Sequence, residues 1–338
     1  MRIAFVIDPL AGLAPGHDTS VALMEAAQRL GAEVWVTGIG DLGLEHDVAV
    51  TRAAPVQLAA AVKSVGRWAT TDAWYQLGTP QRLALADCDA VMMRADPPVD
   101  AAYLRATLVL DAAVRAGTCV VNDPAGLRDS NEKLLPLLLP DLAPATLVTA
   151  NARDIHAALL GWGMGVAKPL EGMAGSGVVI LRDGDPGLHA LLELVTDCGR
   201  RQTVVQEYLT AAADGDKRIL LLDGEPIGAI NRSARPGEFR CNMAKGAIVS
   251  PATIDDHDAE VCRRLAPQLR ARGLHFVGID VIGDRLTEVN VTSPTGIREV
   301  ELAGATNAST RVMEWIVAAA GANRRVTRRS GWRSLNAI

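Results

Sequence analysis

Three oxygen-bearing side chains near the end of the chain are the strongest candidates for chemistry. Asp280 lies in the apolar segment GIDVI, and Glu288 and Asn290 lie two residues apart in TEVNV, after a tight turn at Gly283 and Asp284. Two antiparallel strands joined by such a turn would bring the three side chains to one face. Two carboxylates and an amide oxygen suit Mg²⁺ or Mn²⁺, whereas the alternative is cross-strand polar pairing on a solvated face. Because carboxylates flanked by valines are costly to bury without a cation, the sequence favours a metal site.

A lysine followed by glycines is the second candidate site. Lys168 ends an apolar segment and precedes PLEGMAGSG, in which Gly172, Gly175 and Ser176 would let backbone N–H groups approach a phosphate. The segment is not a P-loop, because no Gly-Lys-Ser/Thr precedes a helix, and an ordinary glycine-rich hairpin is the alternative interpretation. Only five of the 34 basic residues are lysines, and Lys133 is another of them. Lysines this sparse indicate positions that need a compact positive charge.

Two basic segments could face negative charge that develops in a reaction. The sequence DGDKR at 214–218 ends in Arg218 at the start of a predicted strand, and the segment 231–247 carries Arg232 and Arg240 among Gly and Pro residues. A charged turn and an idle surface loop are the ordinary interpretations of such segments. The functional interpretations are a phosphate contact for Arg218 and a mobile lid for 231–247.

The elements that must position these residues show two different sequence patterns along the chain. Residues 2–8, 32–38, 89–96 and 118–122 have the pattern of buried strands that alternate with helices, which predicts a parallel sheet. Residues 44–85 are less periodic and predict no particular element. From about residue 130 the pattern changes to hairpins. We therefore expect an α/β parallel-sheet domain followed by an α+β part with largely antiparallel sheets.

The composition excludes several classes of protein. The chain has 338 residues, of which 49% are apolar and 22% charged, as in a folded protein of two or three domains. A net charge of −5 argues against nucleic-acid binding, and no apolar run is long enough to span a membrane. Five cysteines without C-x-x-C spacing argue against zinc and against a disulfide framework, so we expect a cytoplasmic protein. The opening β-α-β pattern lacks the glycine fingerprint of a nicotinamide-dependent dehydrogenase.

The order of these motifs is more informative than any one of them. The lysines, the glycine segment, VVQEYL, DGDKR, the arginine-bearing loop and the acidic hairpin together resemble the ATP-grasp superfamily, and within it the bacterial glutathione synthetase family. The blocks that carry the resemblance are VIDPL, MRADPP, NEK, KPLEGMAG, DGDKRIL and FVGIDVIGDRLTEVNVTSPTGIRE. The resemblance implies an N-terminal pre-ATP-grasp domain at 1–128, a small lid subdomain at 129–205, a C-terminal subdomain with the metal site and substrate loop at 206–318, and a basic tail at 319–338.

The resemblance also implies a role for each candidate residue. ATP would be bound by Lys133, Lys168, Gly172, Gly175, Ser176, Glu207, Tyr208, Leu209 and Asp216. In the catalytic step, Arg218 would face the transferred phosphoryl group, and Arg232 and Arg240 would hold the acyl donor. The remaining substrate contacts would come from Arg94, Asp18, Ser20, Ser293 and Thr295. The metal would be held by Asp280, Glu288 and Asn290.

The implied activity is an ATP-dependent ligation of a carboxylate to an amine through an acyl phosphate. For the family this means γ-glutamylcysteine and glycine as small-molecule substrates, in a dimeric or tetrameric enzyme. The chain departs from the family pattern at Ala95, Cys241, Lys245, Ala247 and Gly296. These departures would be explained by ordinary sequence drift, or by a sister ligase that joins glutamate or a γ-glutamyl compound to an unusual amino acid. A nucleotide-binding module without catalysis is a further alternative, but it would have lost the acidic trio.

Overall fold

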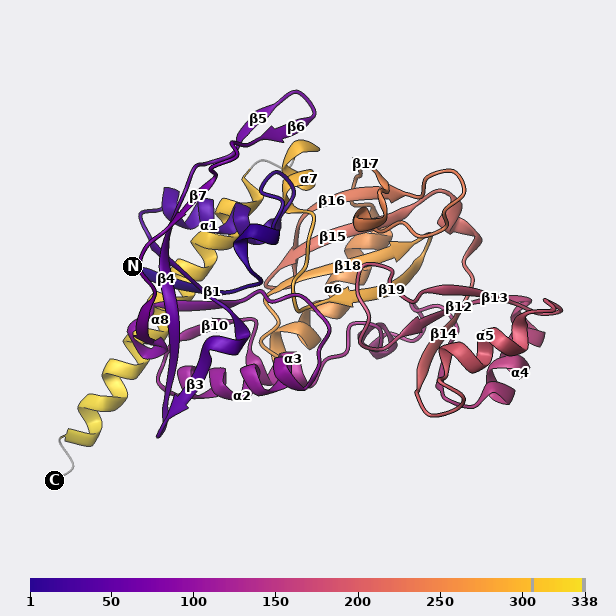
Figure 1. Ribbon diagram of the computed structural model, residues 1–338, viewed down its shortest axis with the longest axis horizontal. Coiled ribbons are helices and arrows are strands. Elements are labelled where there is room, and N and C mark those ends of the chain that lie inside the picture. Colours follow the sequence, from indigo (N-terminus) through magenta and orange to yellow (C-terminus); the bar gives the residue numbers. More distant parts are fainter. Residues whose placement is uncertain (305–306, 336–338) are drawn as a thin grey trace.

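Three parts follow one another along the long axis of the protein (Figure 1). The computed structural model describes residues 1–304 and 307–335. An N-terminal sheet domain lies at one end, a five-stranded antiparallel sheet lies in the middle, and a small unit built on a four-stranded antiparallel sheet lies at the other end. The predicted fold class, a parallel-sheet domain followed by largely antiparallel sheets, is confirmed.

The centre of the N-terminal sheet is parallel, as the alternating pattern predicts. Its four parallel strands, in spatial order, are β10 (Cys119–Val121), β9 (Ala90–Met93), β1 (Arg2–Val6) and β2 (Glu33–Thr37). Nearly all of their side chains are buried, as expected for a sheet covered on both faces. The helices of the β-α-β units are α1 (Thr19–Arg29) and α2 (Ala101–Arg115).

Residues 42–84, which the sequence left unassigned, extend this sheet with antiparallel strands. The long strand β4 (Val48–Leu58) pairs antiparallel with β2, which makes the whole sheet mixed. The further strands that pair with β4 are β3 (Leu42–Glu45), β7 (Tyr75–Leu77) and β8 (Gln81–Ala84). A separate hairpin of β5 (Val62–Ser64) and β6 (Arg67–Ala69) projects from this edge (Figure 1).

The small unit at the far end is a sheet with two helices on one face. Its strands, in spatial order, are β11 (Thr146–Thr149), β14 (Thr203–Glu207), β12 (Met164–Pro169) and β13 (Val179–Arg182). The helices are α4 (Ala152–Trp162) and α5 (Leu188–Val195). Ile155 and Leu159 of α4 pack with Leu192 of α5 and Val205 of β14 in a core of their own.

The five-stranded sheet carries the predicted acidic hairpin. Its strands, in spatial order, are β17 (Ile248–Pro251), β16 (Glu225–Ser233), β15 (Asp216–Leu222), β18 (Phe276–Ile282) and β19 (Arg285–Asn290). Gly283 has a φ of +60° in the tight turn between β18 and β19, a conformation that glycine adopts without strain. The helix α6 (Asp256–Ala271) packs on this sheet through Val261, Leu265 and Leu269.

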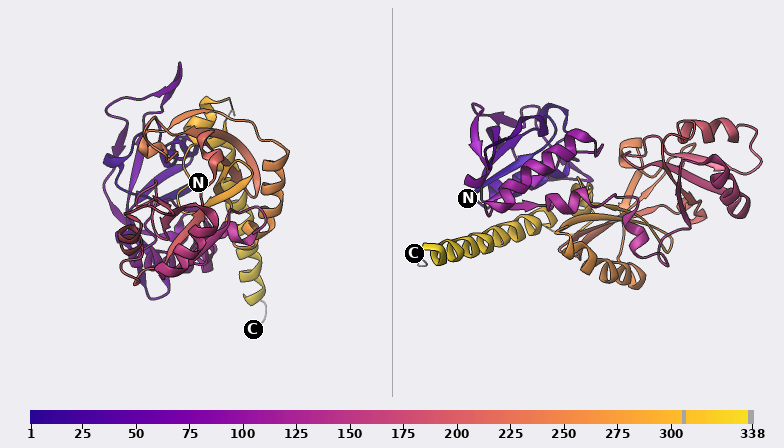
Figure 2. Two further views of the ribbon diagram at one scale, coloured as in Figure 1. Left: turned by 90° about the vertical axis from the view of Figure 1, so that its right-hand side faces the viewer. Right: turned by 90° about the horizontal axis from the view of Figure 1, so that it is seen from below.

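The end of the chain returns to the N-terminal domain. The short helices α3 (Pro124–Arg128) and α7 (Ile297–Leu302) lie where the chain leaves that domain and re-enters it, and the long helix α8 (Ala308–Leu335) then runs along it (Figure 2). Met313 and Ile316 of α8 share a core with Ile3 of β1. The predicted tail starts inside this helix, where Ala320 is still buried, and its last residues, 336–338, lie outside the described part of the chain.

Within residues 1–304 and 307–335, six short 3₁₀ helices connect these elements. They are Leu10–Gly12, Ile39–Asp41, Leu85–Asp87, Leu135–Leu138, Thr210–Ala213 and Met243–Lys245. Among the described residues, no helix is both long enough and apolar enough to cross a membrane.

Candidate active site

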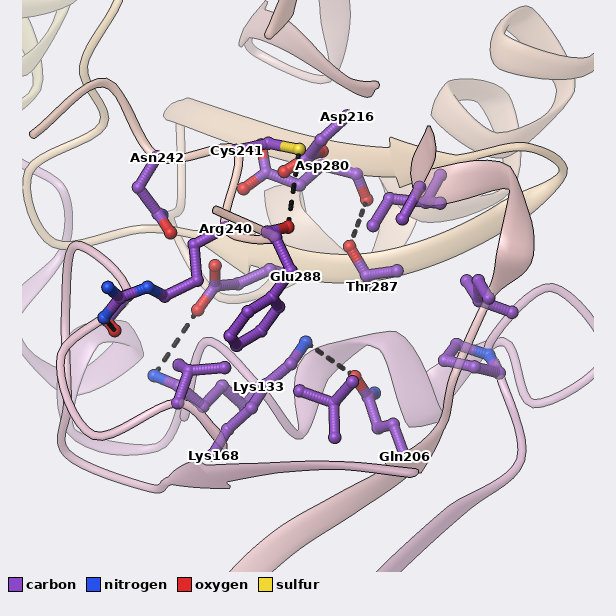
Figure 3. A pocket seen from close by; sticks show the side chains of 18 of the residues that line it. Lys133, Lys168, Gln206, Asp216, Arg240, Cys241, Asn242, Asp280, Thr287 and Glu288 are labelled. Carbon is purple, nitrogen blue, oxygen red and sulfur yellow. Dashed lines mark hydrogen bonds and ion pairs between the residues drawn. The ribbon is translucent and has the colours of Figure 1, made fainter. Parts of the chain in front are cut away.

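A pocket lies between the small unit and the five-stranded sheet, and we call it the nucleotide pocket (Figure 3). Its lining contains every residue that the sequence assigned to ATP: Lys133, Lys168, Gly172, Gly175, Ser176, Glu207, Tyr208, Leu209 and Asp216. Glu207 ends β14, and Tyr208 and Leu209 begin the segment that leads from the small unit to Asp216, the first residue of β15. The structure therefore brings these nine residues together, although their contact with ATP stays a prediction.

The two predicted phosphate-binding lysines, Lys133 before the small unit's sheet and Lys168 on β12, both line this pocket. Lys133 Nζ donates to the carbonyl of Gly172 at 2.6 Å and lies 3.4 Å from Glu288 Oε1. Lys168 Nζ donates to Gln206 Oε1 at 2.7 Å (Figure 3). Burial lowers the pKa of Lys168, against the opposing effect of Glu288 and other nearby carboxylates. A buried ammonium held only by an amide oxygen gains by meeting an anion, which suits a phosphate.

A row of charged residues crosses the five-stranded sheet below the pocket. We call it the charge row, and its members are Arg232 on β16, Asp216 and Arg218 on β15, Asp280 on β18 and Glu288 on β19. The strand register creates it, because Asp216 lies opposite Arg232, Arg218 opposite Asp280, and Asp280 opposite Glu288. Alternate residues of a strand share a face, so these pairs all project to one side of the sheet.

Asp280 is the centre of the charge row. Arg218 binds it with two nitrogens, and the Arg218 Nη2–Asp280 Oδ2 distance is 2.8 Å. Arg232 Nη2 lies 3.0 Å from Asp280 Oδ1 and 2.6 Å from Asp216 Oδ2, so one guanidinium serves two carboxylates. Burial alone would raise the pKa of Asp280, but the two arginines outweigh it and hold that pKa below its usual range. Asp280 is therefore a fixed negative charge in the floor of the site.

Asp216 experiences the opposite balance. Burial raises its pKa to about 6, because its attraction to the shared Arg232 is weaker than the cost of desolvation and Asp280 repels it. One of its carboxylate oxygens, Oδ1, is buried and has no hydrogen-bond partner among the described residues. The two aspartates of the charge row therefore have pKa values shifted in opposite directions although they share an arginine.

A second cavity of about 440 Å³ adjoins the other side of the charge row, and we call it the acid chamber. It is lined from both domains, by residues 12–14, 17–18 and 96–97 of the first and by Arg218, Arg232, Asn290, Ser293 and Thr295 of the second, among others. Of the predicted substrate residues, Asp18, Ser293 and Thr295 line this chamber. Asp18 also caps α1, since its Oδ1 accepts from the N–H of Val21 at 2.8 Å.

Arg94 and Ser20, the other two predicted substrate residues, lie behind the chamber wall. Both are buried, and Arg94 Nε donates to Ser20 Oγ at 3.1 Å. Arg94 Nη2 donates to the carbonyl of Pro294 at 3.0 Å, so this arginine supports the segment that carries Ser293 and Thr295. Its third nitrogen, Nη1, is buried, and no described residue is its hydrogen-bond partner. Arg94 is thus placed to orient the chamber wall.

Arg240 lies on the nucleotide-pocket side, apart from the other two predicted catalytic arginines. Its Nη1 donates to the carbonyl of Gly175 at 3.0 Å, and Glu238 binds the same guanidinium at 2.7 Å. Gly175 has a φ of +72°, and a Cβ there would collide with the Asn242 side chain. The segment 231–247 therefore closes directly onto the glycine-rich loop, which is the position predicted for a lid.

Comparison with known proteins supplies the family. Residues 1–128 match the family model of the prokaryotic glutathione synthetase N-terminal domain, and residues 132–304 match the model of the prokaryotic glutathione synthetase ATP-grasp domain. The chain belongs to the prokaryotic glutathione synthetase family. It is accordingly an ATP-grasp ligase, and ATP is its nucleotide.

Curated relatives and solved structures agree with the family models. The chain is 49% identical to a glutathione synthetase of Thermosynechococcus vestitus, covering 94% of this chain and 99% of that one. It is 41% identical to the glutathione synthetase of Salmonella typhimurium, covering 89% and 93%. The fold is similar to D-cycloserine synthetase DcsG, with a TM-score of 0.65, 16% identity and coverage of 95% and 100%. It is also similar to the ATP-grasp ligase PsnB in complex with a precursor variant, Mg and ADP, with a TM-score of 0.61, 20% identity and coverage of 94% and 98%.

The three predicted metal ligands of this family member lie together. Asp280 and Glu288 are direct cross-strand neighbours, and Asn290 Nδ2 donates to Asp280 Oδ2 at 3.3 Å and to the carbonyl of Gly278 at 3.3 Å. The Asn290 amide oxygen has no hydrogen-bond partner among the described residues. Within residues 1–304 and 307–335, no group of three His, Cys, Asp or Glu residues could hold a metal. The donor set of two carboxylates and an amide nevertheless fits Mg²⁺, which takes its other ligands from phosphates and water.

The sequence predicted no role for two residues of the site. Gln206 holds Lys168, and it lies in VVQEYL next to residues that were assigned to ATP. Glu132 lines the acid chamber and lies next to Lys133. A buried polar residue in an apolar strand was an available signal for Gln206, since such a residue needs a partner. Nothing local in the sequence shows what Glu132 contacts, because its partners lie about 160 residues further along.

Proposed function

We propose that this protein condenses γ-glutamylcysteine with glycine, converting ATP to ADP and phosphate through a γ-glutamylcysteinyl phosphate. The observation that carries the proposal is the meeting of two pockets at one charge row, with Glu288 in the lining of both. A carboxylate in the acid chamber and the γ-phosphate in the nucleotide pocket would approach each other across that row. The relatives named glutathione synthetase, matched over nearly their full length, support this choice of substrates.

In the first step the carboxylate of the acid attacks the γ-phosphorus, and ADP leaves. Both reactants are anions, so their repulsion must be offset before they come into contact. Lys133 and Lys168 would bind phosphate oxygens from the pocket side, and Arg218 and Arg232 would hold the acid from the chamber side. Mg²⁺ or Mn²⁺ held by Asp280, Glu288 and Asn290 would add a positive charge on the phosphates between them.

In the second step the amino group of glycine attacks the acyl phosphate carbon, and phosphate leaves from a tetrahedral intermediate. Arg218 is well placed to stabilise the oxygens of that intermediate, because Asp280 and the carbonyl of Thr295, 3.2 Å from its Nη1, fix the guanidinium. A pre-oriented cation requires little reorganisation as charge develops.

Water must be kept away from the acyl phosphate until the amine arrives. The contact of Arg240 with the carbonyl of Gly175 joins the lid segment to the glycine loop over the nucleotide pocket. Closing both segments together would remove water from the phosphates and strengthen every electrostatic contact beneath them.

The positions where the chain departs from the family pattern support the ordinary substrates. Ala95 packs in the core, and Gly296 has a φ of +108°, a left-handed conformation that favours glycine. Cys241 lines the nucleotide pocket rather than the acid chamber. None of these departures lies in the described lining of the chamber, so we expect them to leave the acid substrate unchanged.

The test is a screen for ADP release over acids and amines. We expect γ-glutamylcysteine with glycine to give the highest kcat/KM, and glutamate with any single amino acid to give little turnover. Turnover with glutamate that exceeds turnover with the dipeptide would refute the substrate assignment. A dimer or tetramer and a cytoplasmic location belong to the same proposal, and light scattering of the purified protein tests the assembly.

A further inference from the structure

A short segment around the start of the matched ATP-grasp domain, residues 131–133, which we call the linker, contacts both walls of the active site. Asn131, Glu132 and Lys133 are consecutive residues of this linker, and each of them contacts a wall. Lys133 contacts the glycine loop and Glu288, as described above. The other two residues make contacts that no role in binding ATP or substrate explains.

Glu132 is attached to the end of β19 by four hydrogen bonds. Its carbonyl oxygen accepts from the N–H of Val289 at 2.9 Å. Its side-chain Oε1 accepts from the N–H of Val291 at 2.8 Å, from the N–H of Thr292 at 3.0 Å and from the hydroxyl of Thr292 at 2.8 Å. A carboxylate oxygen with three donors has its acceptor capacity filled by one short segment of chain.

These bonds lie where the sheet would otherwise have a free edge. β19 is the last strand of the five-stranded sheet, and its outward N–H groups have no further strand to pair with. Glu132 accepts hydrogen bonds from the N–H groups of Val289 and Val291, the two residues on either side of Asn290. The side chains of Glu288 and Asn290 are thereby held at fixed positions along a strand that could otherwise fray.

Asn131 makes the matching contact with the opposite wall. Its Nδ2 donates to the carbonyl of Leu170 at 3.0 Å, just before the glycines of the phosphate loop. Its Oδ1 accepts from the N–H of Lys133 at 3.0 Å, which fixes the turn of the linker. One side chain thus binds both the loop and the lysine that points into it.

We propose that Asn131 and Glu132 are positioning residues that hold the phosphate loop and the metal-binding strand at the separation that a nucleotide and its cation require. This inference rests on the proposed metal site and deepens it. Glu132 acts through Glu288 and Asn290, and Asn131 acts through residues 170–172 and Lys133.

The test compares three variants with a matched control. Glu132→Ala removes all three side-chain hydrogen bonds, whereas Glu132→Gln keeps an oxygen in the same place and serves as the rescue. Glu301 is the control, because it is equally a buried glutamate whose Oε1 accepts from a backbone N–H (2.8 Å) and a hydroxyl (2.6 Å), both of Ser309. Asn131→Ala probes the other wall.

The readouts are calorimetric binding of a non-hydrolysable ATP analogue at a series of Mg²⁺ concentrations, and amide hydrogen exchange at Val291 and Thr292. We expect Glu132→Ala to raise the Mg²⁺ concentration needed for tight binding about 10- to 100-fold, as loss of a residue that orients metal ligands does. Exchange at the two amides should accelerate in this variant. Glu132→Gln should stay close to the native protein in both readouts, and Glu301→Ala should change neither, even where it lowers the melting temperature. Asn131→Ala should weaken analogue binding at saturating Mg²⁺.

Several results would overturn the inference. These are an unchanged Mg²⁺ dependence in Glu132→Ala, an equal change in Glu301→Ala, or a failure of Glu132→Gln to restore binding. The native protein could bind the analogue with Mg²⁺ and yet not ligate γ-glutamylcysteine to glycine. In that case the proposed substrates would be wrong, and the Mg²⁺ dependence of analogue binding in the variants would still test the role of Asn131 and Glu132. The binding experiment therefore separates the two proposals.

Discussion

The nucleotide pocket and the acid chamber are built in different ways although they share a wall. Every residue in the described lining of the nucleotide pocket comes from positions 133–288, within the matched ATP-grasp domain. The acid chamber draws residues 12–14, 17–18 and 96–97 from the N-terminal domain and the rest of its described lining from positions 132–295, within the matched ATP-grasp domain. One site is local to a domain, and the other exists only where two domains meet.

This difference separates the chemistry from the choice of substrate. In the proposed function, phosphate binding would depend on lysines, glycines and acidic residues that one domain positions by itself. The acid substrate would be held between the domains, so its selection could change with loops of the N-terminal domain while the phosphoryl transfer is kept.

The largest effect should follow from Glu288→Gln, because Glu288 lines both cavities. The change removes a proposed metal ligand and the ion pair with Lys133, and we expect turnover to fall by about 100-fold or more. ADP release measures it, and the melting temperature should stay near that of the native protein. Glu225→Gln is the control, since Glu225 is an exposed glutamate of the same sheet. Near-native turnover in Glu288→Gln would show that the two cavities do not meet there.

The next effect tests the chamber alone. Arg218→Lys keeps a cation beside Asp280 but loses the two-nitrogen geometry and the contact with Thr295. We expect kcat to fall about 100-fold, with the dissociation constant of ATP unchanged, because Arg218 does not line the nucleotide pocket. A change in ATP affinity as large as the change in kcat would mean that the two cavities are one functional unit.

A smaller effect tests the pocket alone. Lys168→Met removes the ammonium but keeps the apolar stem, and we expect the KM for ATP to rise about tenfold, the value of one charge-assisted hydrogen bond. The KM for the acid should not change, because Lys168 is absent from the described lining of the chamber. Steady-state kinetics with each substrate varied in turn distinguish these outcomes. A similar rise in both KM values would contradict the separation of the nucleotide pocket from the acid chamber.

Much of the fold follows from local pattern, and the exceptions are informative. The alternation of apolar strands with helices predicts the parallel strands of the first sheet, and the turn at Gly283 predicts the β18–β19 hairpin. The strands of residues 42–84 were not predicted, because β4 is assembled by pairing with four different strands. Short strands such as β7 gain stability from those neighbours, and local sequence carries little of that information.

The same distinction between local sequence pattern and distant contacts applies to the site. The sequence motifs and their resemblance to the family could predict that the nine residues assigned to ATP line one pocket and that the acidic trio lies together, because each residue belongs to a short motif. The support given by Arg94 to Pro294 joins positions 200 residues apart, and the bonds of Glu132 to Val291 join positions 159 apart. Such contacts depend on how the domains pack, so the sequence predicts that Arg94 matters without showing that it acts from behind the chamber wall.

The smallest predicted effect concerns Asp216 and Asp280, the two aspartates that share Arg232 across the boundary between the cavities. The pKa of Asp216 is raised from 3.8 to about 6, so the folded state binds its proton more tightly than the unfolded state does. Its contribution to stability is complete below about pH 4 and is lost as the pH rises to about 6. Asp216→Asn carries no such loss.

The stability of Asp216→Asn relative to the native protein should therefore increase between about pH 4 and pH 6 and then stay level. The increase arises because native Asp216 must lose its proton in this range, whereas the amide of the variant does not titrate. Urea unfolding at intervals from pH 4 to pH 8 measures the difference. Asp280→Asn should be less stable than the native protein by a nearly constant amount over this range, because the lowered pKa of Asp280 places its titration below about pH 4 and the variant leaves two buried arginines without their shared carboxylate. If the stability of Asp280→Asn relative to the native protein also rose between about pH 4 and pH 6, the common arginine would not hold the two carboxylates at different pKa values.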